Sequence, residues 1–144
     1  MLGRRGVMAS GAVLLGWPAL AAEPELGFAA LYASVGVRGV VLSERVRQLT
    51  GGMVAMTGYM APPLQAESQF FVLTSEPLSL CPFCQSDADW PIDIVVIYLR
   101  QAGALPGGGA RIRALGRLDV GSWADPETGF VSLVRLMEAR LVVR

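Results

Sequence analysis

The strongest constraint on the fold is a series of five short apolar segments after residue 52. They cover residues 53–60, 67–75, 93–99, 110–120 and 131–143. The segments are rich in β-branched and aromatic residues, and prolines, glycines and a turn at residues 125–129 separate them. Short segments of this composition, bounded by turn residues, are typical of β-strands. We therefore expect a mainly β protein.

Two glycines inside these segments indicate how the sheet curves. Gly58 and Gly116 each interrupt an apolar stretch, and a glycine or bulge within a strand lets a small sheet curl on itself. The continuous apolar runs at 67–75 and 93–99 predict strands covered on both faces. Residues 131–143 also fit helical spacing, but the preceding turn and the valines favour a strand. The prediction is a small five-stranded OB-like barrel over residues 53–144, with a β-sandwich fragment as the alternative.

Residues 22–52 form a predicted helical lead-in to this barrel. Apolar residues between Glu25 and Ser34 recur on one helical face. A second short helix is expected to begin after Ser43, a possible N-cap, and to end at Gly51 and Gly52. The chain should therefore carry one or two short N-terminal helices.

Residues 1–21 have the pattern of a signal peptide. Arg4 and Arg5 precede a stretch without charge, which ends in an Ala-Leu-Ala sequence at residues 19–21. The two arginines fit in part the twin-arginine export pattern, and they also fit an ordinary secretory signal. After this segment the longest apolar run is residues 94–99, far shorter than a membrane span. We expect an exported, periplasmic protein with no membrane span after cleavage.

Composition excludes several classes of function. The chain has no histidine, which rules out Ser-His-Asp and Cys-His catalysis and imidazole metal ligands. All 12 basic residues are arginines and there are 12 acidic residues. Because two arginines lie in the predicted signal, the remainder is slightly acidic, which argues against a nucleic-acid partner. We expect a binding protein and not an enzyme.

The chemistry-bearing residues are concentrated between the second and third predicted strands. Cys81 and Cys84 form a C-x-x-C motif, and Asp87 and Asp89 follow it closely. Two thiolates at this spacing can bind zinc, with the two carboxylates as further ligands. Two thiolates also suit cuprous copper, with a thioether as an additional ligand. The four residues are the predicted metal ligands.

Two other interpretations of the cysteine pair remain open. An oxidising compartment permits a structural disulfide that pins the loop. A thiol oxidoreductase is the third interpretation, although no helix of useful length can follow the motif before Pro91. Met53, Met56 and Met60 are candidate thioether ligands for copper, but methionines within a strand are more often core residues.

The central part of the chain resembles the DUF3299 group of uncharacterised, exported bacterial proteins. The matching residues are Gly58, Tyr59, Met60, Pro62, Leu64, Phe70, Phe71, Val72, Leu73, Cys81, Pro82 and Val95. Many members carry histidine and prolines after the first cysteine, where this chain has Pro82, Phe83 and Cys84. The resemblance implies a small OB-like periplasmic domain that accompanies an ABC-type envelope transporter for metals. The alternative is a non-catalytic interaction domain of such a transporter, with the cysteines in a structural disulfide.

Overall fold

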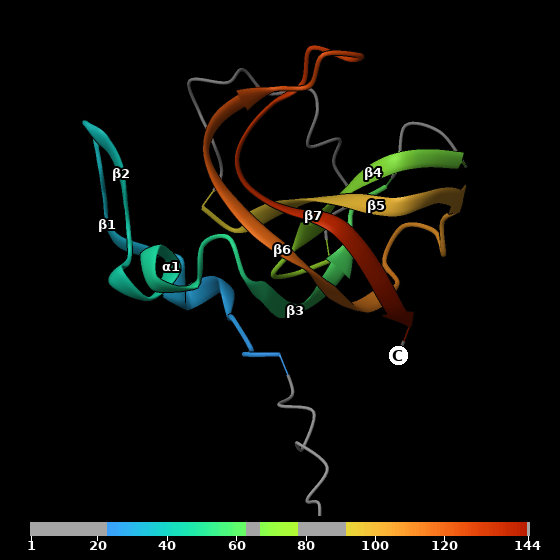
Figure 1. The fold of residues 1–144 in the computed structure, drawn as a ribbon, viewed down its shortest axis with the longest axis horizontal. Helices are drawn as coiled ribbons and strands as arrows, with labels where there is room; N and C mark the ends of the chain where they lie inside the picture. The colour runs from blue at the N-terminus through green and yellow to red at the C-terminus, as the bar shows by residue number, and fades with distance from the viewer. Residues whose placement is uncertain (1–22, 63–66, 78–91, 144) are drawn as a thin grey trace, which may run out of the picture.

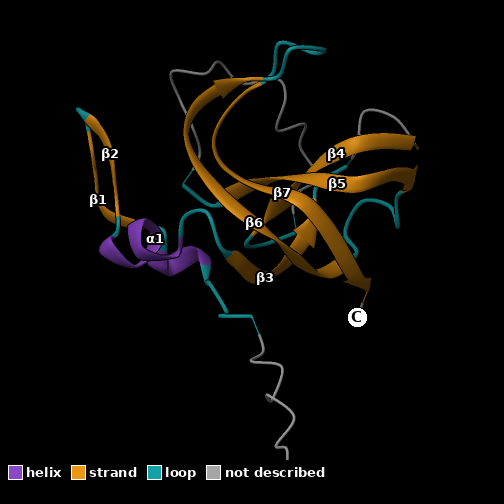
Figure 2. Ribbon diagram, viewed as in Figure 1, coloured by secondary structure: helices purple, strands orange, loops and turns teal. Residues whose placement is uncertain are grey.

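The computed structural model describes residues 23–62, 67–77 and 92–143 (Figure 1). The lead-in contains a 3-10 helix, η1 (Phe28–Ala30), two strands, β1 (Tyr32–Gly36) and β2 (Gly39–Leu42), and a helix, α1 (Glu44–Leu49). Five longer strands follow: β3 (Met53–Met60), β4 (Glu67–Thr74), β5 (Ile94–Ala104), β6 (Arg111–Ala124) and β7 (Val131–Val143). Figure 2 shows that strands make up most of the fold. None of the helices in the described residues has the length and apolar character of a membrane-spanning helix.

The five long strands form a closed barrel in the order β3-β4-β5-β7-β6. β6 returns to β3 and closes the barrel through seven antiparallel pairs, from Met53 opposite Arg117 to Tyr59 opposite Arg111. Only β5 and β7 are parallel. The predicted five-stranded, OB-like barrel is confirmed, and residues 131–143 are a strand and not a helix.

The two glycines singled out in the sequence lie where strands approach each other closely. A Cβ atom on Gly58 would lie 2.4 Å from the carbonyl oxygen of Thr74. A Cβ atom on Gly116 would lie 2.9 Å from the Cβ atom of Leu136. Any larger residue would therefore push neighbouring strands apart, and both glycines are needed for the tight closure of the barrel.

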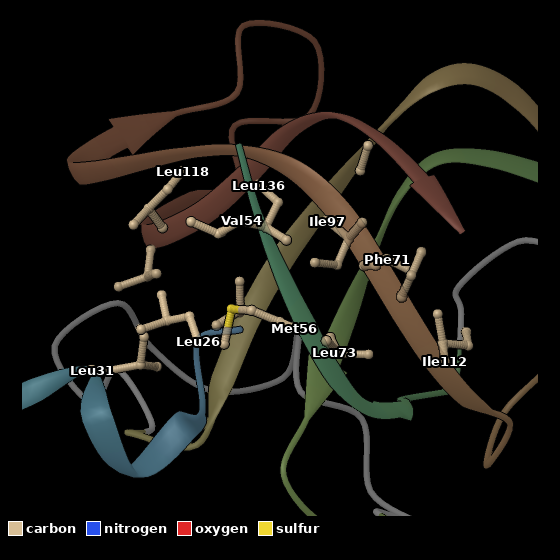
Figure 3. Packing of buried hydrophobic residues seen from close by; sticks show 14 of the residues in the cluster. Leu26, Leu31, Val54, Met56, Phe71, Leu73, Ile97, Ile112, Leu118 and Leu136 are labelled. Atoms are coloured by element: carbon tan, nitrogen blue, oxygen red, sulfur yellow. The ribbon is translucent and has the colours of Figure 1, made fainter. Parts of the chain in front are cut away.

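The main core fills the inside of the barrel, and the lead-in closes one end of it (Figure 3). Buried side chains of the barrel strands, such as Phe71 and Ile97, form one cluster with Leu26, Leu31 and Val46 of the lead-in. Glu25 adds a polar contact, because its carboxylate lies 2.8 Å from Nε of Arg113 on β6. The lead-in is therefore packed on the barrel.

The lead-in differs in part from the prediction. The expected helix over residues 25–34 is wrong in extent, because only Phe28–Ala30 is helical and a strand begins at Tyr32. Residues 32–36 pair instead with β2, whose Val40 and Val41 favour a strand, in a hairpin. The second helix is confirmed, and the hydroxyl of Ser43 accepts a hydrogen bond from the Val46 amide at 3.1 Å.

The third barrel strand is longer than expected. The apolar run ends at Leu99, but β5 continues to Ala104 because Gly103 and Ala104 still pair with β4. Its first five residues are buried, whereas residues 100–104 are exposed. The hydrophobic pattern therefore predicted only the buried half of this strand.

Candidate functional site

The four predicted metal ligands belong to the connection between β4 and β5. Cys81, Cys84, Asp87 and Asp89 lie outside the described residues. The two ends of the connection are described, and they leave the barrel side by side. The last pair of the strands joins Thr74 to Ile94, and the amide of Ser75 donates to the carbonyl of Asp93 at 3.1 Å.

A buried threonine stabilises the start of this connection. Thr74 is fully buried, and its hydroxyl oxygen lies 2.6 Å from the carbonyl oxygen of Glu76. The same hydroxyl lies 3.1 Å from the carbonyl oxygen of Tyr59 on β3. The position at which the cysteine-containing segment leaves the sheet is therefore held by both backbone and side-chain hydrogen bonds.

A second hydrophobic cluster lies on the outer side of β4 and β5. We call it the outer cluster; its buried members are Ala61, Val72, Ile94, Val96 and Tyr98, and Phe70, Trp123, Phe130 and Met137 pack against them. Along β4 and β5, residues of this cluster alternate with residues of the main core, as strand geometry requires. This explains why both strands appear in the sequence as continuous apolar runs, and it confirms that both faces are covered.

Aromatic rings form much of the outer cluster. The Phe70 ring stacks on Tyr98, with 5.2 Å between centroids, and on Phe130, with 5.7 Å. Trp123 meets Tyr98 edge to face at 5.4 Å. These four residues come from β4, β5, β6 and the end of the 125–129 turn, so single-sequence patterns gave no sign that they would meet.

A buried arginine supports the same region. Arg135 on β7 is only 3% exposed, and its Nε donates to the carboxylate of Asp119 at 2.8 Å. Its Nη1 donates to the carbonyls of Gly121 and Ser132, and its guanidinium lies 5.2 Å from the ring centroid of Trp123. A buried charge needs such compensation, so these contacts fix the ring of Trp123 and the bent part of β6.

Tyr98 places a polar atom inside the outer cluster. Its hydroxyl is buried and has no hydrogen bond of acceptable geometry within the described residues. Burial, and then the neighbouring Asp125 carboxylate, raise the pKa of Tyr98 well above its ordinary value. The Asp125 carboxylate itself accepts from the amides of Glu127 and Thr128 in the turn that follows β6. Tyr98 therefore stays protonated and acts as a packed ring rather than as an acid or base.

The candidate thioether ligands divide between core and surface. Met56 and Met60 are fully buried in the main core, whereas Met53 is 39% exposed. Among the described residues, no group of three or more His, Cys, Asp or Glu side chains could hold a metal ion. The proposed protein ligands therefore remain the four residues of the β4–β5 connection.

Comparison with known proteins gives no functional information. No protein-family model matches the chain, and no curated protein or solved structure is significantly similar to it. The class that the structure itself defines is a mainly β protein with a small, closed, mixed five-stranded barrel.

Proposed function

We propose that the chain is a non-catalytic binding protein of the bacterial periplasm, whose β4–β5 connection binds a metal ion. One observation supports this proposal most directly. OB-like barrels bind ligands mainly on the face of their second and third strands, and β4 and β5 occupy these positions in the barrel order. The outer cluster covers one face of this strand pair, and the C-x-x-C motif lies in the connection between the two strands.

The donor set favours zinc. Cys81 and Cys84 supply two thiolates, and Asp87 and Asp89 can supply two carboxylate oxygens, which together suit a tetrahedral zinc site. Cuprous copper prefers sulfur ligands, but Met56 and Met60 are committed to the core. Copper is therefore the second choice of metal.

The physiological role follows from the resemblance to DUF3299 proteins and from the predicted signal peptide. On this hypothesis the protein is an accessory to envelope metal transport, and its partner is an ABC-type transporter. The barrel supplies a rigid base for the cysteine-containing connection, whose ends are joined by the Thr74–Ile94 pair and the Ser75–Asp93 hydrogen bond.

Metal binding by purified protein with reduced thiols tests the proposal. We expect one zinc ion per chain in competition with a chromophoric chelator, and loss of this binding in the double variant Cys81→Ser/Cys84→Ser. The variant Asp87→Asn/Asp89→Asn should bind more weakly, because it removes the oxygen ligands. Asp93→Asn is the matched control, since it removes a nearby carboxylate outside the proposed ligand set, and it should bind as tightly as the wild type.

Two results would contradict metal binding and support the other interpretations. A stable disulfide, with no metal bound after reduction, would favour a transporter interaction domain with a structural disulfide. A reduction potential close to those of catalytic dithiols would favour a thiol oxidoreductase, because structural disulfides have much lower potentials.

A further inference from the structure

The barrel wall opens between β5 and β7. The two strands pair in parallel from Val96 opposite Arg135 to Leu99 opposite Ala139. Beyond this last pair β5 pairs with β4 again only at Gly103 and Ala104, after a register shift, whereas β7 continues along β6. Figure 1 shows the C-terminal parts of the two strands running apart. In the part of the chain that the structure describes, the facing edges of these two strand ends have no strand partner.

A bulge in β7 lies at this opening, beside the register shift of β5 against β4. Leu136 and Ala139 lie opposite Ile97 and Leu99, so β7 has one more residue than β5 between these pairs. The same extra residue shifts the register of β7 against β6. Glu138, within the bulge, has a φ of 51°, which is uncommon for a residue other than glycine. Bulges bend a strand and end its pairing, and here the bend directs the end of β7 away from β5.

The opening is a groove with an apolar floor and a basic rim. Its volume is about 380 Å³. The lining includes Leu99, Ala139 and Leu141, which belong to the main core or pack against it. Arg100 and Arg140 also line the groove, and both are exposed.

The two arginines of the rim have no acidic partner in the part of the chain that the structure describes. Within the described residues, neither Arg100 nor Arg140 has an ion pair or a side-chain hydrogen bond. By contrast, Arg113, Arg117 and Arg135 each lie within 4.0 Å of a carboxylate oxygen. The groove therefore combines unpaired strand edges with two guanidinium groups that can bind carboxylates.

We propose that this β5–β7 groove binds an extended segment of a partner protein in which apolar and acidic residues alternate. The segment would add as a strand to the free backbone edges, a recurring mode of peptide recognition. Because successive side chains of a strand point to opposite faces, apolar side chains would contact the Leu99–Leu141 floor. The intervening carboxylates would then lie beside Arg100 and Arg140. This inference does not rest on metal binding by the β4–β5 connection.

Peptide binding measured by fluorescence anisotropy tests the inference. The probe is a fluorescein-labelled peptide of alternating valine and glutamate, capped at both ends. A peptide with lysine in place of glutamate tests the role of charge. A glutamate peptide methylated on alternate backbone nitrogens tests strand addition, because it cannot donate along one edge. We expect saturable binding of the first peptide only.

Charge-reversal variants locate the binding site. Arg100→Glu/Arg140→Glu should weaken binding of the glutamate peptide at least about tenfold, because like charges across an interface are strongly unfavourable. The same variant should gain affinity for the lysine peptide. Arg47→Glu/Arg111→Glu is the matched control, since both arginines are exposed and lie outside the groove. It should bind the glutamate peptide as the wild type does.

Hydrogen exchange on the wild-type protein gives a readout that needs no variant. Adding the glutamate peptide should slow amide exchange in residues 100–104 and 139–142. The inference is wrong if the glutamate peptide does not bind, if the methylated peptide binds equally well, or if protection appears elsewhere on the barrel. It is also wrong if the wild type self-associates and Arg100→Glu/Arg140→Glu abolishes this self-association without changing peptide binding. The groove would then be an interface between two copies of this chain.

Discussion

Tyr98 shows how a single residue can be well packed and still contain an energetic defect. Its ring contacts Phe70 and Trp123, which stabilises the outer cluster. Its hydroxyl, however, is buried without a hydrogen bond of acceptable geometry in the described residues. A buried hydroxyl without a well-aligned hydrogen bond contributes little to folding, so its removal is expected to cost little.

The variant Tyr98→Phe should therefore be as stable as the wild type at neutral pH, or more stable by about 1 kcal/mol. The pH dependence gives a second test. The pKa of Tyr98 is raised in the folded state, so above about pH 10 the unfolded chain loses this proton while the folded protein retains it. The free energy of unfolding of the wild type should fall as the pH rises through this range, and Tyr98→Phe should lack this part of the loss.

Urea unfolding at several pH values measures both effects. Tyr59→Phe serves as the control, because Tyr59 lies on β3 outside the outer cluster; it should keep the alkaline loss attributed to Tyr98. A clear loss of stability in Tyr98→Phe at neutral pH would show that the hydroxyl has a favourable partner.

Single-residue properties were only partly predictable from the sequence. Gly58 and Gly116 were identified as positions of curvature, and the structure places both against neighbouring strands. Glycine weakens a strand, so a glycine within a strand often marks a bend or a close approach of another backbone. The ion pair of the buried Arg135 with the partly exposed Asp119 was not predicted. Arginine is usually exposed, so the residue type by itself does not indicate that Arg135 is buried.

At the scale of elements, α1 depends on one side chain that contacts two parts of the lead-in. The hydroxyl of Ser43 accepts a hydrogen bond from the Val46 amide at 3.1 Å and donates to the carbonyl of Ala30 at 2.6 Å. It therefore caps the helix and also joins it to η1. Val46, on the buried face of α1, is fully enclosed in the main core.

Ser43→Ala should lower the free energy of unfolding by about 1–2 kcal/mol, since helix caps contribute about this much and the bond to Ala30 is lost as well. Ser43→Thr should restore most of the stability, because threonine keeps a hydroxyl that can accept and donate. Ser34→Ala, at an exposed position of β1, is the matched control and should have little effect. Equal stability of Ser43→Ala and the wild type would contradict the role assigned to this cap.

The elements themselves were predicted best where local patterns are strong. Five barrel strands and the helix after Ser43 were located correctly, because turns and an N-cap mark their limits. The helix expected at 25–34 was mostly wrong, since pairing of β1 with β2 outweighs a weak helical pattern. The outer cluster was not foreseen, because its aromatic residues are far apart in the sequence.

At the scale of the whole molecule, the barrel and the β1–β2 hairpin differ greatly in strand pairing and in burial. β6 has strand partners on both sides, whereas β1 and β2, within the described ranges, pair only with each other. The hairpin also exposes Val35, Val37 and Val41. An isolated pair of strands is only marginally stable in water, although Tyr32 and Leu42, at the base of the hairpin, pack against the main core.

Hydrogen exchange followed by mass spectrometry should therefore show two classes of backbone amide. Amides of the hairpin at residues 33–41 should exchange far faster than those of β6, because local opening of the hairpin leaves the barrel core intact. The strand β3, which is joined to β6 by seven pairs, is the internal standard and should exchange as slowly as β6. Equal protection of the hairpin and the barrel would mean that they open together.

The barrel order also determines how the protein can be assembled during synthesis. β7 covers an edge of β5 and an edge of β6, yet it is the last of the five strands along the chain. Until its 13 residues are available, the edges of β5 and β6 that it covers have no partner, and the apolar residues of the other four strands lack its side of the core. Such surfaces promote aggregation of nascent chains. A ribosome that stops before Val131 would thus release a chain that requires a chaperone, whereas complete synthesis supplies the strand that pairs with β6 and with β5 as far as Leu99.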